Sequence, residues 1–216
     1  LFLLFYFGCT IAGLYFLFYR CVLWVLINSE NVKIFEEKKT FSFRMLFLFA
    51  GILFLCMIPF LLSNYPAIMT PDSLSQYRQA AGIGGYSDHH PWFHTLMFQF
   101  FYKFGLMMSG NEYFSIACYT LAQMLLVALS VGYVWCTFYE LGLKKNYCIV
   151  GVTLFVIYPY NLIYAVTIWK DVLFTMSVLV LTITLYRLFL QVRAEEKIQL
   201  RDMIIYFVSS FFMCML

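Results

Sequence analysis

The chain has 216 residues, of which 63% are hydrophobic and 21% aromatic, whereas only 12% are charged. Soluble domains carry roughly 25% charged residues, and a core of this size cannot hide so much apolar surface from water. These values exclude a disordered chain, a nucleic-acid-binding module and a secreted disulfide scaffold. With a formal net charge of only +3, the chain is predicted to be an integral, multi-pass membrane protein.

A helix needs about 20 apolar residues to cross the hydrocarbon of a bilayer. By this measure about six segments are predicted to span it: 1–27, 41–62, 113–139, 147–167, 171–190 and one that starts near Met203. The predicted fold class is therefore an all-α polytopic membrane protein. Because both ends of the sequence lie inside apolar runs, we interpret residues 1–216 as a single transmembrane domain that is a fragment of a longer chain.

Basic residues set the predicted orientation through the positive-inside rule. Lys33, Lys38, Lys39 and Arg44 cluster at the start of the second span, and Lys144 and Lys145 separate the third from the fourth. Arg187 lies near the end of the fifth, and Arg193, Lys197 and Arg201 follow it. If these loops are cytoplasmic, segments 63–91 and 158–170 face outward. This orientation holds only if segment 92–108 does not cross the bilayer. Interfacial or re-entrant helices are therefore predicted within an outer loop, residues 63–112. The inner loops are interpreted as solvated charged surface.

The first outer segment contains a carboxylate close to the expected edge of the hydrocarbon. Two prolines stop the preceding helix, and Thr70 or Asp72 then caps a new one, with Gln76 a candidate capping-box partner of Ser73. Asp72 is therefore either a helix cap or a carboxylate able to act as a general base.

All three histidines of the chain lie in segment 86–95. Pro91 suits the first turn of a helix, which would place His90 and His94 one turn apart on the same face. This spacing permits contact with a substrate or phosphate group, a metal site with Asp88 as the third ligand, or a purely structural role.

The second outer segment also supplies an acid and a base. Pro159 lets the fourth helix break, and Asn161 can satisfy the freed backbone. Lys170 and Asp171 follow at the start of the fifth span and project about 100° apart on a helix. Alternatively, Trp169 and Lys170 form an interfacial anchor and Asp171 complements the helix N-terminus. The two outer loops are predicted to converge on one outward-facing cavity.

These loops resemble the C-type (GT-C) polytopic membrane glycosyltransferases, which include protein O-mannosyltransferases, aminoarabinose transferases and oligosaccharyltransferase catalytic subunits. The residues that carry the resemblance are 71–77, His89-His90-Pro91 and Trp169-Lys170-Asp171. They are also similar to an uncharacterised bacterial branch of that superfamily. The resemblance covers residues 41–190, the module that such folds share, but the second proline of the common His-Pro-Pro pattern is Trp92 here.

The resemblance implies transfer of a sugar from a polyprenyl-phosphate carrier to a glycan, lipid or protein acceptor at the extracytoplasmic face of a bacterial plasma membrane. Asp72 and Asp171 would be the catalytic carboxylates, and Lys170 would neutralise the carrier phosphate. Further predicted substrate or phosphate contacts are Arg78, His90, His94, Gln76 and Tyr77.

The lipid-linked sugar is thus the expected donor substrate, and no further cofactor is required by these residues. A divalent metal held by Asp88, His90 and His94 is the alternative for the histidine segment. For the whole chain, the alternative is a transporter or flippase of a lipid-linked or small anionic substrate, which charges near the middle of the membrane would favour.

Overall fold

The computed structural model describes residues 10, 12–20, 22–23, 35–85 and 91–216. Its named helices are α2 (Phe43–Ser63), α3 (Pro71–Ala80), α4 (Trp92–Ser109), α5 (Glu112–Glu140), α6 (Lys145–Ile157), α7 (Pro159–Val166), α8 (Lys170–Arg193) and α9 (Leu200–Met215). Two short strands, β1 (Ile68–Met69) and β2 (Thr167–Ile168), pair in parallel. The all-α prediction is therefore confirmed, with this two-residue ladder as an addition.

Three of the described helices, α2, α5 and α8, are long and apolar enough to cross a membrane. A fourth span exists if α6 and α7, which are bent by 69° relative to each other, count as one. The predicted number of about six is not confirmed, since most of segment 1–27 lies outside the described residues and α9 is not among these helices.

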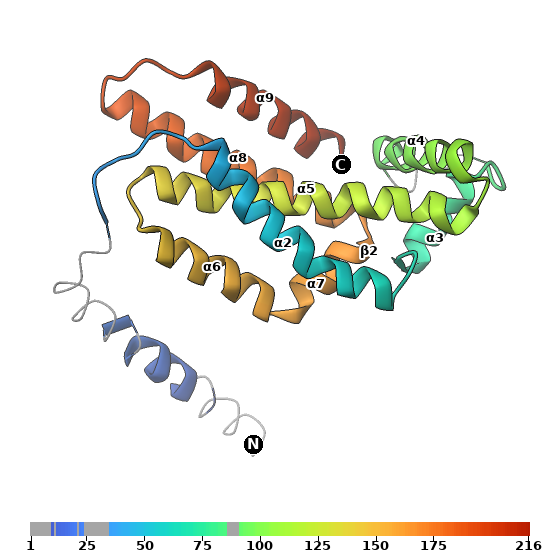
Figure 1. Ribbon diagram of the computed structural model, residues 1–216, viewed down its shortest axis with the longest axis horizontal. Helices are drawn as coiled ribbons and strands as arrows, with labels where there is room; N and C mark the ends of the chain where they lie inside the picture. Colours follow the sequence, from blue (N-terminus) through green and yellow to red (C-terminus); the bar gives the residue numbers. More distant parts are fainter. Residues whose placement is uncertain (1–9, 11, 21, 24–34, 86–90) are drawn as a thin grey trace.

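Helix α5 is the centre of the arrangement, and α2, α4, α6 and α8 pack against it (Figure 1). Glycines allow two of these contacts to be close. A Cβ atom added to Gly105 of α4 would lie 2.5 Å from the Cα atom of Ser115 on α5, and one added to Gly151 of α6 would overlap the ring of Trp135. Small residues at such contacts are typical of membrane helix pairs.

Two apolar clusters form the core. The larger one joins α2, α5, α6 and α7 and includes Phe49, Leu53, Met57, Met124, Val127, Val152, Leu162 and Val166. The smaller one joins α3, α4, α5 and β2 and includes Ala80, Phe98, Tyr102, Ile116, Tyr119 and Ile168. Val166 and Ile168 belong to different clusters, so the short α7–β2 segment connects them.

The break between α6 and α7 follows from Pro159, as predicted. A helix would bond the N–H of residue 159 to the carbonyl of Phe155, but proline has no N–H. The side-chain amide of Asn161 donates to that carbonyl instead, at 2.8 Å. The prediction that Asn161 satisfies the freed backbone is confirmed.

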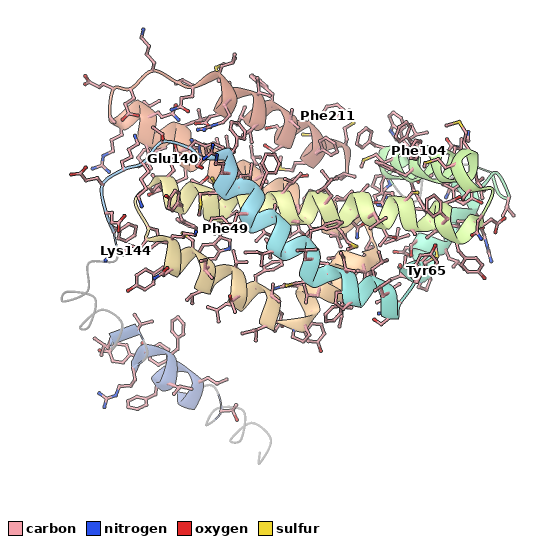
Figure 2. The ribbon with its side chains drawn as sticks, viewed as in Figure 1. Phe49, Tyr65, Phe104, Glu140, Lys144 and Phe211 are labelled. Carbon is pink, nitrogen blue, oxygen red and sulfur yellow. The ribbon has the colours of Figure 1, made fainter. Side chains whose placement is uncertain are left out.

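The two ends of the bundle differ in charge. Tyr65 and Phe104 mark the end that holds β1, β2, α3 and α4, here called the ladder end, whereas Glu140 and Lys144 lie at the opposite, basic end (Figure 2). The described charges of the ladder end are balanced: Arg78, Lys103 and Lys170 against Asp72, Glu112 and Asp171. The basic end carries an excess of cations, among them Lys38, Lys39, Arg44, Lys144, Lys145, Arg193 and Lys197.

Candidate functional site

The two predicted outer segments meet in the β1–β2 ladder. Ile68 pairs with Thr167 and Met69 pairs with Ile168, in parallel. This backbone pairing joins the segment after α2 to the segment after α7. The two loops from which the sequence nominated carboxylates therefore lie together at the ladder end.

Asp72 and Asp171 occupy equivalent positions after the two strands of the ladder. Helix α3 starts directly after the cap that follows Met69, and α8 starts directly after the cap that follows Ile168. Each carboxylate thus lies in the first turn of its helix. Because paired parallel strands run in the same direction, both helices start at the same end of the ladder, the C-terminal end of its strands. Helix N-termini carry partial positive charge, so this end is suited to bind an anion.

Asp72 is not the helix cap. Thr70 holds that position: the N–H of Ser73 donates to the Thr70 hydroxyl at 3.3 Å, and the N–H of Thr70 donates to the Ser73 hydroxyl at 2.6 Å. The predicted pairing of Gln76 with Ser73 in a capping box is wrong, because Ser73 stands three residues after the cap and closes the box itself. Gln76 is instead buried on α3, and its amide nitrogen has no hydrogen-bond partner among the described residues.

Four charged side chains of the ladder end, Asp72, Arg78, Lys170 and Asp171, make no ion pair or side-chain hydrogen bond within the part of the chain that the structure describes. Lys170 is half-buried and the other three are exposed. Lys170 and Asp171 do not pair with each other. These groups are thus open to interact with a ligand.

An apolar cavity of about 250 Å³ lies between α5, α6, α7 and α8, next to the ladder. Its lining residues are Val127, Phe155, Asn161, Tyr164, Ala165, Trp169, Asp171, Val172, Thr175 and Met176. Asp171 is the charged member of this set. The cavity therefore combines hydrophobic walls with one carboxylate at the start of α8.

Two other predicted contact residues, His94 and Tyr77, form hydrogen bonds between helices of the fold. His94 is fully buried, and its Nε2 shares a hydrogen bond of 2.7 Å with the hydroxyl of Tyr119 on α5. The structure thus places His94 in a structural position, one of the roles left open by the sequence. The hydroxyl of Tyr77 donates to Glu112 at 3.2 Å and so joins α3 to the start of α5. Burial raises the pKa of the Tyr77 phenol.

The metal alternative cannot be placed on the structure in full, since Asp88 and His90 lie outside the described residues. Within the described ranges, no group of three or more histidine, cysteine, aspartate or glutamate side chains could hold a metal ion. His94 lies in the buried core.

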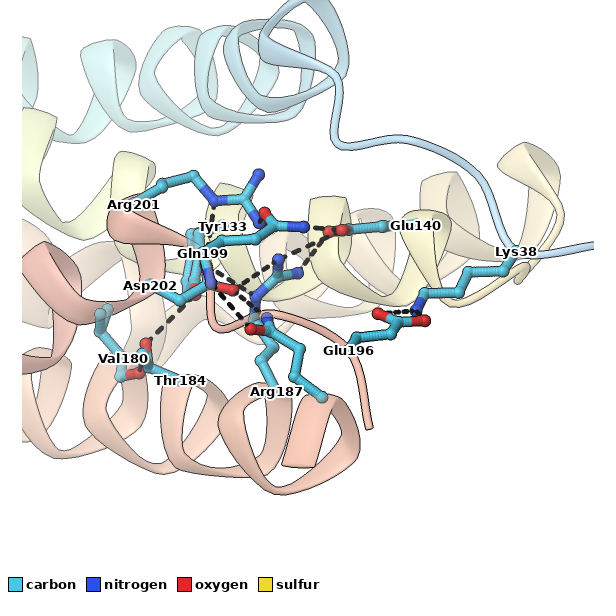
Figure 3. Close-up of polar contacts among 11 residues, drawn as sticks. Lys38, Tyr133, Glu140, Val180, Thr184, Arg187, Glu196, Gln199, Arg201 and Asp202 are labelled. Carbon is cyan, nitrogen blue, oxygen red and sulfur yellow. Dashed lines mark hydrogen bonds and ion pairs between the residues drawn. The ribbon is translucent and has the colours of Figure 1, made fainter. Parts of the chain in front are cut away.

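The basic end holds a polar cluster that the sequence analysis missed (Figure 3). Arg187 is 4% exposed and forms ion pairs with Glu140 of α5 and with Asp202 of α9, the latter at 3.1 Å. Gln191 donates to Asp202 at 2.5 Å, and Arg201 pairs with the same carboxylate at 2.9 Å. The prediction that these residues form solvated surface is wrong, because α5, α8 and α9 pack around them.

The buried carboxylate of Asp202 is matched within the protein. Arg201 and Arg187 both donate hydrogen bonds to it, at 2.9 and 3.1 Å, which offsets the cost of removing its charge from water. The sequence does carry one sign of this cluster. Arg187 lies well inside an otherwise apolar helical segment, a position that usually requires a partner.

Residues 84–216 match a family described as a family of unknown function (DUF6020). The chain belongs to this family. The matched region contains α4 to α9, and therefore Lys170, Asp171, the apolar cavity and the buried Arg187 cluster, whereas Asp72 and α3 precede it. No curated protein and no solved structure matches the chain.

Proposed function

We propose that this chain is the transmembrane module of a C-type (GT-C) glycosyltransferase that uses a polyprenyl-phosphate sugar as donor at the extracytoplasmic face of a bacterial plasma membrane. In this proposal about six segments cross the bilayer, including the first apolar run and α9. The observation that carries it is the β1–β2 ladder. The helices that follow its two strands begin with Asp72 and Asp171 in their first turns, and neither carboxylate has a cation partner among the described residues.

The chemistry of glycosyl transfer suits a pair of carboxylates. The acceptor oxygen attacks the anomeric carbon of the sugar, the bond from that carbon to the phosphate oxygen breaks, and the polyprenyl phosphate leaves with the electron pair. The acceptor hydroxyl loses its proton in the same step, so a carboxylate within hydrogen-bond reach accelerates the reaction. Asp72, which is exposed and free of a capping role, is the proposed base, and Asp171 is proposed to orient the acceptor and sugar.

The departing phosphate needs positive charge near it. Lys170 and Arg78 have no carboxylate partner among the described residues, and the N-termini of α3 and α8 add partial positive charge. The apolar cavity lined by Asp171 and Trp169 offers hydrophobic walls for the first units of the polyprenyl chain.

A transporter or flippase is the second candidate, and the broken α6–α7 pair favours it. The two helices are bent by 69°, and residues from both sides of the break, Phe155 and Asn161, line the cavity. Discontinuous helices that line a central cavity are a recurrent feature of secondary transporters. Movement of an intact labelled lipid-linked sugar across proteoliposomes, without loss of the sugar from its carrier, would support this candidate.

Loss of either carboxylate should stop sugar transfer. We expect Asp72→Asn and Asp171→Asn each to lower transfer by about 100-fold or more, the usual contribution of a positioned acid or base. The measurement is release of labelled sugar from polyprenyl phosphate by the purified full-length protein.

The matched controls lie at the basic end. Glu195→Gln removes an exposed carboxylate there, and Lys144→Ala is compared with Lys170→Ala. Transfer that is undiminished in Asp72→Asn would reject Asp72 as the base. If Lys144→Ala and Lys170→Ala lower sugar transfer equally, the ladder end is rejected as the site.

A further inference from the structure

Gln123 lies in the middle of α5 and is 1% exposed. Its side-chain amide nitrogen donates to the carbonyl of Thr167 at 2.7 Å and to that of Ala165 at 3.0 Å, with the carbonyl of Tyr164 at 3.5 Å. One side chain of the central helix thus holds the end of α7 and the start of β2.

These carbonyls need a donor because α7 ends there. The last carbonyls of a helix have no partner within it. Thr167 satisfies two of them: its N–H bonds to the carbonyl of Tyr164, and its hydroxyl donates to that of Ile163 at 2.8 Å. Gln123 supplies the donor for Ala165 and Thr167. Because both residues are buried, water cannot easily replace this donor.

The ladder depends on such an anchor. Two paired residues are fewer than an isolated pair of strands needs for stability in water, and a slip of one residue would exchange the two faces of a strand. Packing of Ile168 in the smaller apolar cluster favours burial but is not directional. The bonds from Gln123 are directional, so they can set the position of Thr167 opposite Ile68.

We propose that Gln123 is the positioning residue of the site: it fixes β2 in register with β1 and thereby places Asp171 next to Asp72. The proposal rests on the proposed glycosyl transfer for its functional meaning. Its structural content, the dependence of the Asp72–Asp171 arrangement on Gln123, can be measured without any activity.

The amide nitrogen is the part of Gln123 that acts. The side-chain oxygen has no hydrogen-bond partner among the described residues, so its loss should cost little. Gln123→Met keeps the length of the side chain and removes both donors. Gln123→Leu also removes both donors, with a shorter and branched apolar side chain. Both variants should release β2.

The control removes a buried hydrogen bond elsewhere on α5. The hydroxyls of Tyr133 and Thr184 share a bond of 3.1 Å between α5 and α8, away from the ladder. Tyr133→Phe breaks this bond without touching α7, β1 or β2. A general loosening of the bundle would therefore appear in Tyr133→Phe as well as in the Gln123 variants.

The experiment measures cross-linking between the two site positions. Asp72→Cys and Asp171→Cys are introduced together into the full chain lacking its other cysteines, and bismaleimides of graded length are applied in membranes. Both positions are exposed and therefore accessible to the reagent. We expect Gln123→Met to lower the yield with the shortest effective reagent by about tenfold, as for the loss of two buried hydrogen bonds, and Tyr133→Phe to leave it unchanged.

Unchanged cross-linking in Gln123→Met, or an equal loss in Tyr133→Phe, would overturn the proposal. If Gln123→Met does not fold, as judged by gel filtration, Gln123→Leu carries the same comparison. In the chain with Asp72 and Asp171 intact, Gln123→Met should also lower sugar transfer by about 100-fold, the effect of a small misplacement of reacting groups. If cross-linking depends on Gln123 but the native chain transfers no sugar, the proposed function fails and the positioning role stands.

Discussion

Arg187 and Asp171 show how differently single charges are used at the two ends of this molecule. Arg187 is buried between Glu140 and Asp202, and its planar guanidinium can donate to both carboxylates. Asp171 is exposed and has no cation partner among the described residues. A buried charge must be matched within the protein, since its removal from water is costly. The paired group therefore serves the fold, whereas the unpaired carboxylate is available to a ligand.

Removal of Arg187 should be strongly destabilising. Arg187→Met leaves Glu140 with only Arg201, 3.8 Å away, and deprives Asp202 of one of its two cations. We therefore expect the free energy of unfolding to fall by about 3–5 kcal/mol. Denaturant unfolding of the protein in detergent micelles measures the change. Adding Glu140→Gln and Asp202→Asn to the same variant should recover much of the loss. Equal stability of Arg187→Met and the native chain would contradict the buried cluster.

At the scale of elements, α5 organises the fold because the other helices can approach it closely. The α4–α5 contact depends on Gly105, which faces the backbone of Ser115. The same contact carries the buried His94–Tyr119 hydrogen bond. Any residue larger than glycine at position 105 must therefore push α4 away and stretch that bond.

A side chain at position 105 should disturb this contact. Gly105→Ala is expected to lower the free energy of unfolding by about 1–3 kcal/mol through overpacking. Gly51→Ala is the matched control, because Gly51 lies in α2 with no atom within 4 Å of an added Cβ. Alanine at position 51 should be neutral or stabilise by about 0.5–1 kcal/mol through its better helix propensity. Thermal unfolding in detergent compares the two variants. A larger loss of stability in Gly51→Ala than in Gly105→Ala would refute the close α4–α5 approach.

For the whole molecule, charge asymmetry is the feature that sets the expected orientation. Cations are in excess at the basic end, whereas the described charges of the ladder end are balanced. Under the positive-inside rule, we expect the basic end to face the cytoplasm. The ladder, its carboxylates and the adjoining cavity would then lie toward the extracytoplasmic side, where the proposed reaction requires them.

Cysteine labelling tests this orientation. In a chain lacking its other cysteines, Ile83→Cys reports on the ladder end and Lys145→Cys on the basic end, and both positions are exposed. A membrane-impermeant maleimide should label Ile83→Cys in intact cells and Lys145→Cys only after the cells are permeabilised. The reverse pattern would invert the orientation and exclude an extracytoplasmic site.

Local chemistry by itself determined much of this protein. Hydropathy predicted the apolar helices, Pro159 and Asn161 predicted the broken helix and its repair, and Thr70 was one of two predicted caps. Each of these depends on residues within a few positions of one another, so a sequence pattern can reveal it.

Only the tertiary structure decided how these parts combine. The register of the β1–β2 ladder, the anchoring of β2 by Gln123, the burial of His94 and the pairing of Arg187 with Glu140 and Asp202 all join residues far apart in the chain. Apolar patterning shows that a helix is buried but not which partner it meets, because the hydrophobic effect is non-directional. The sequence predicted that the loops of Asp72 and Asp171 converge, but only the fold showed the backbone pairing that joins these loops.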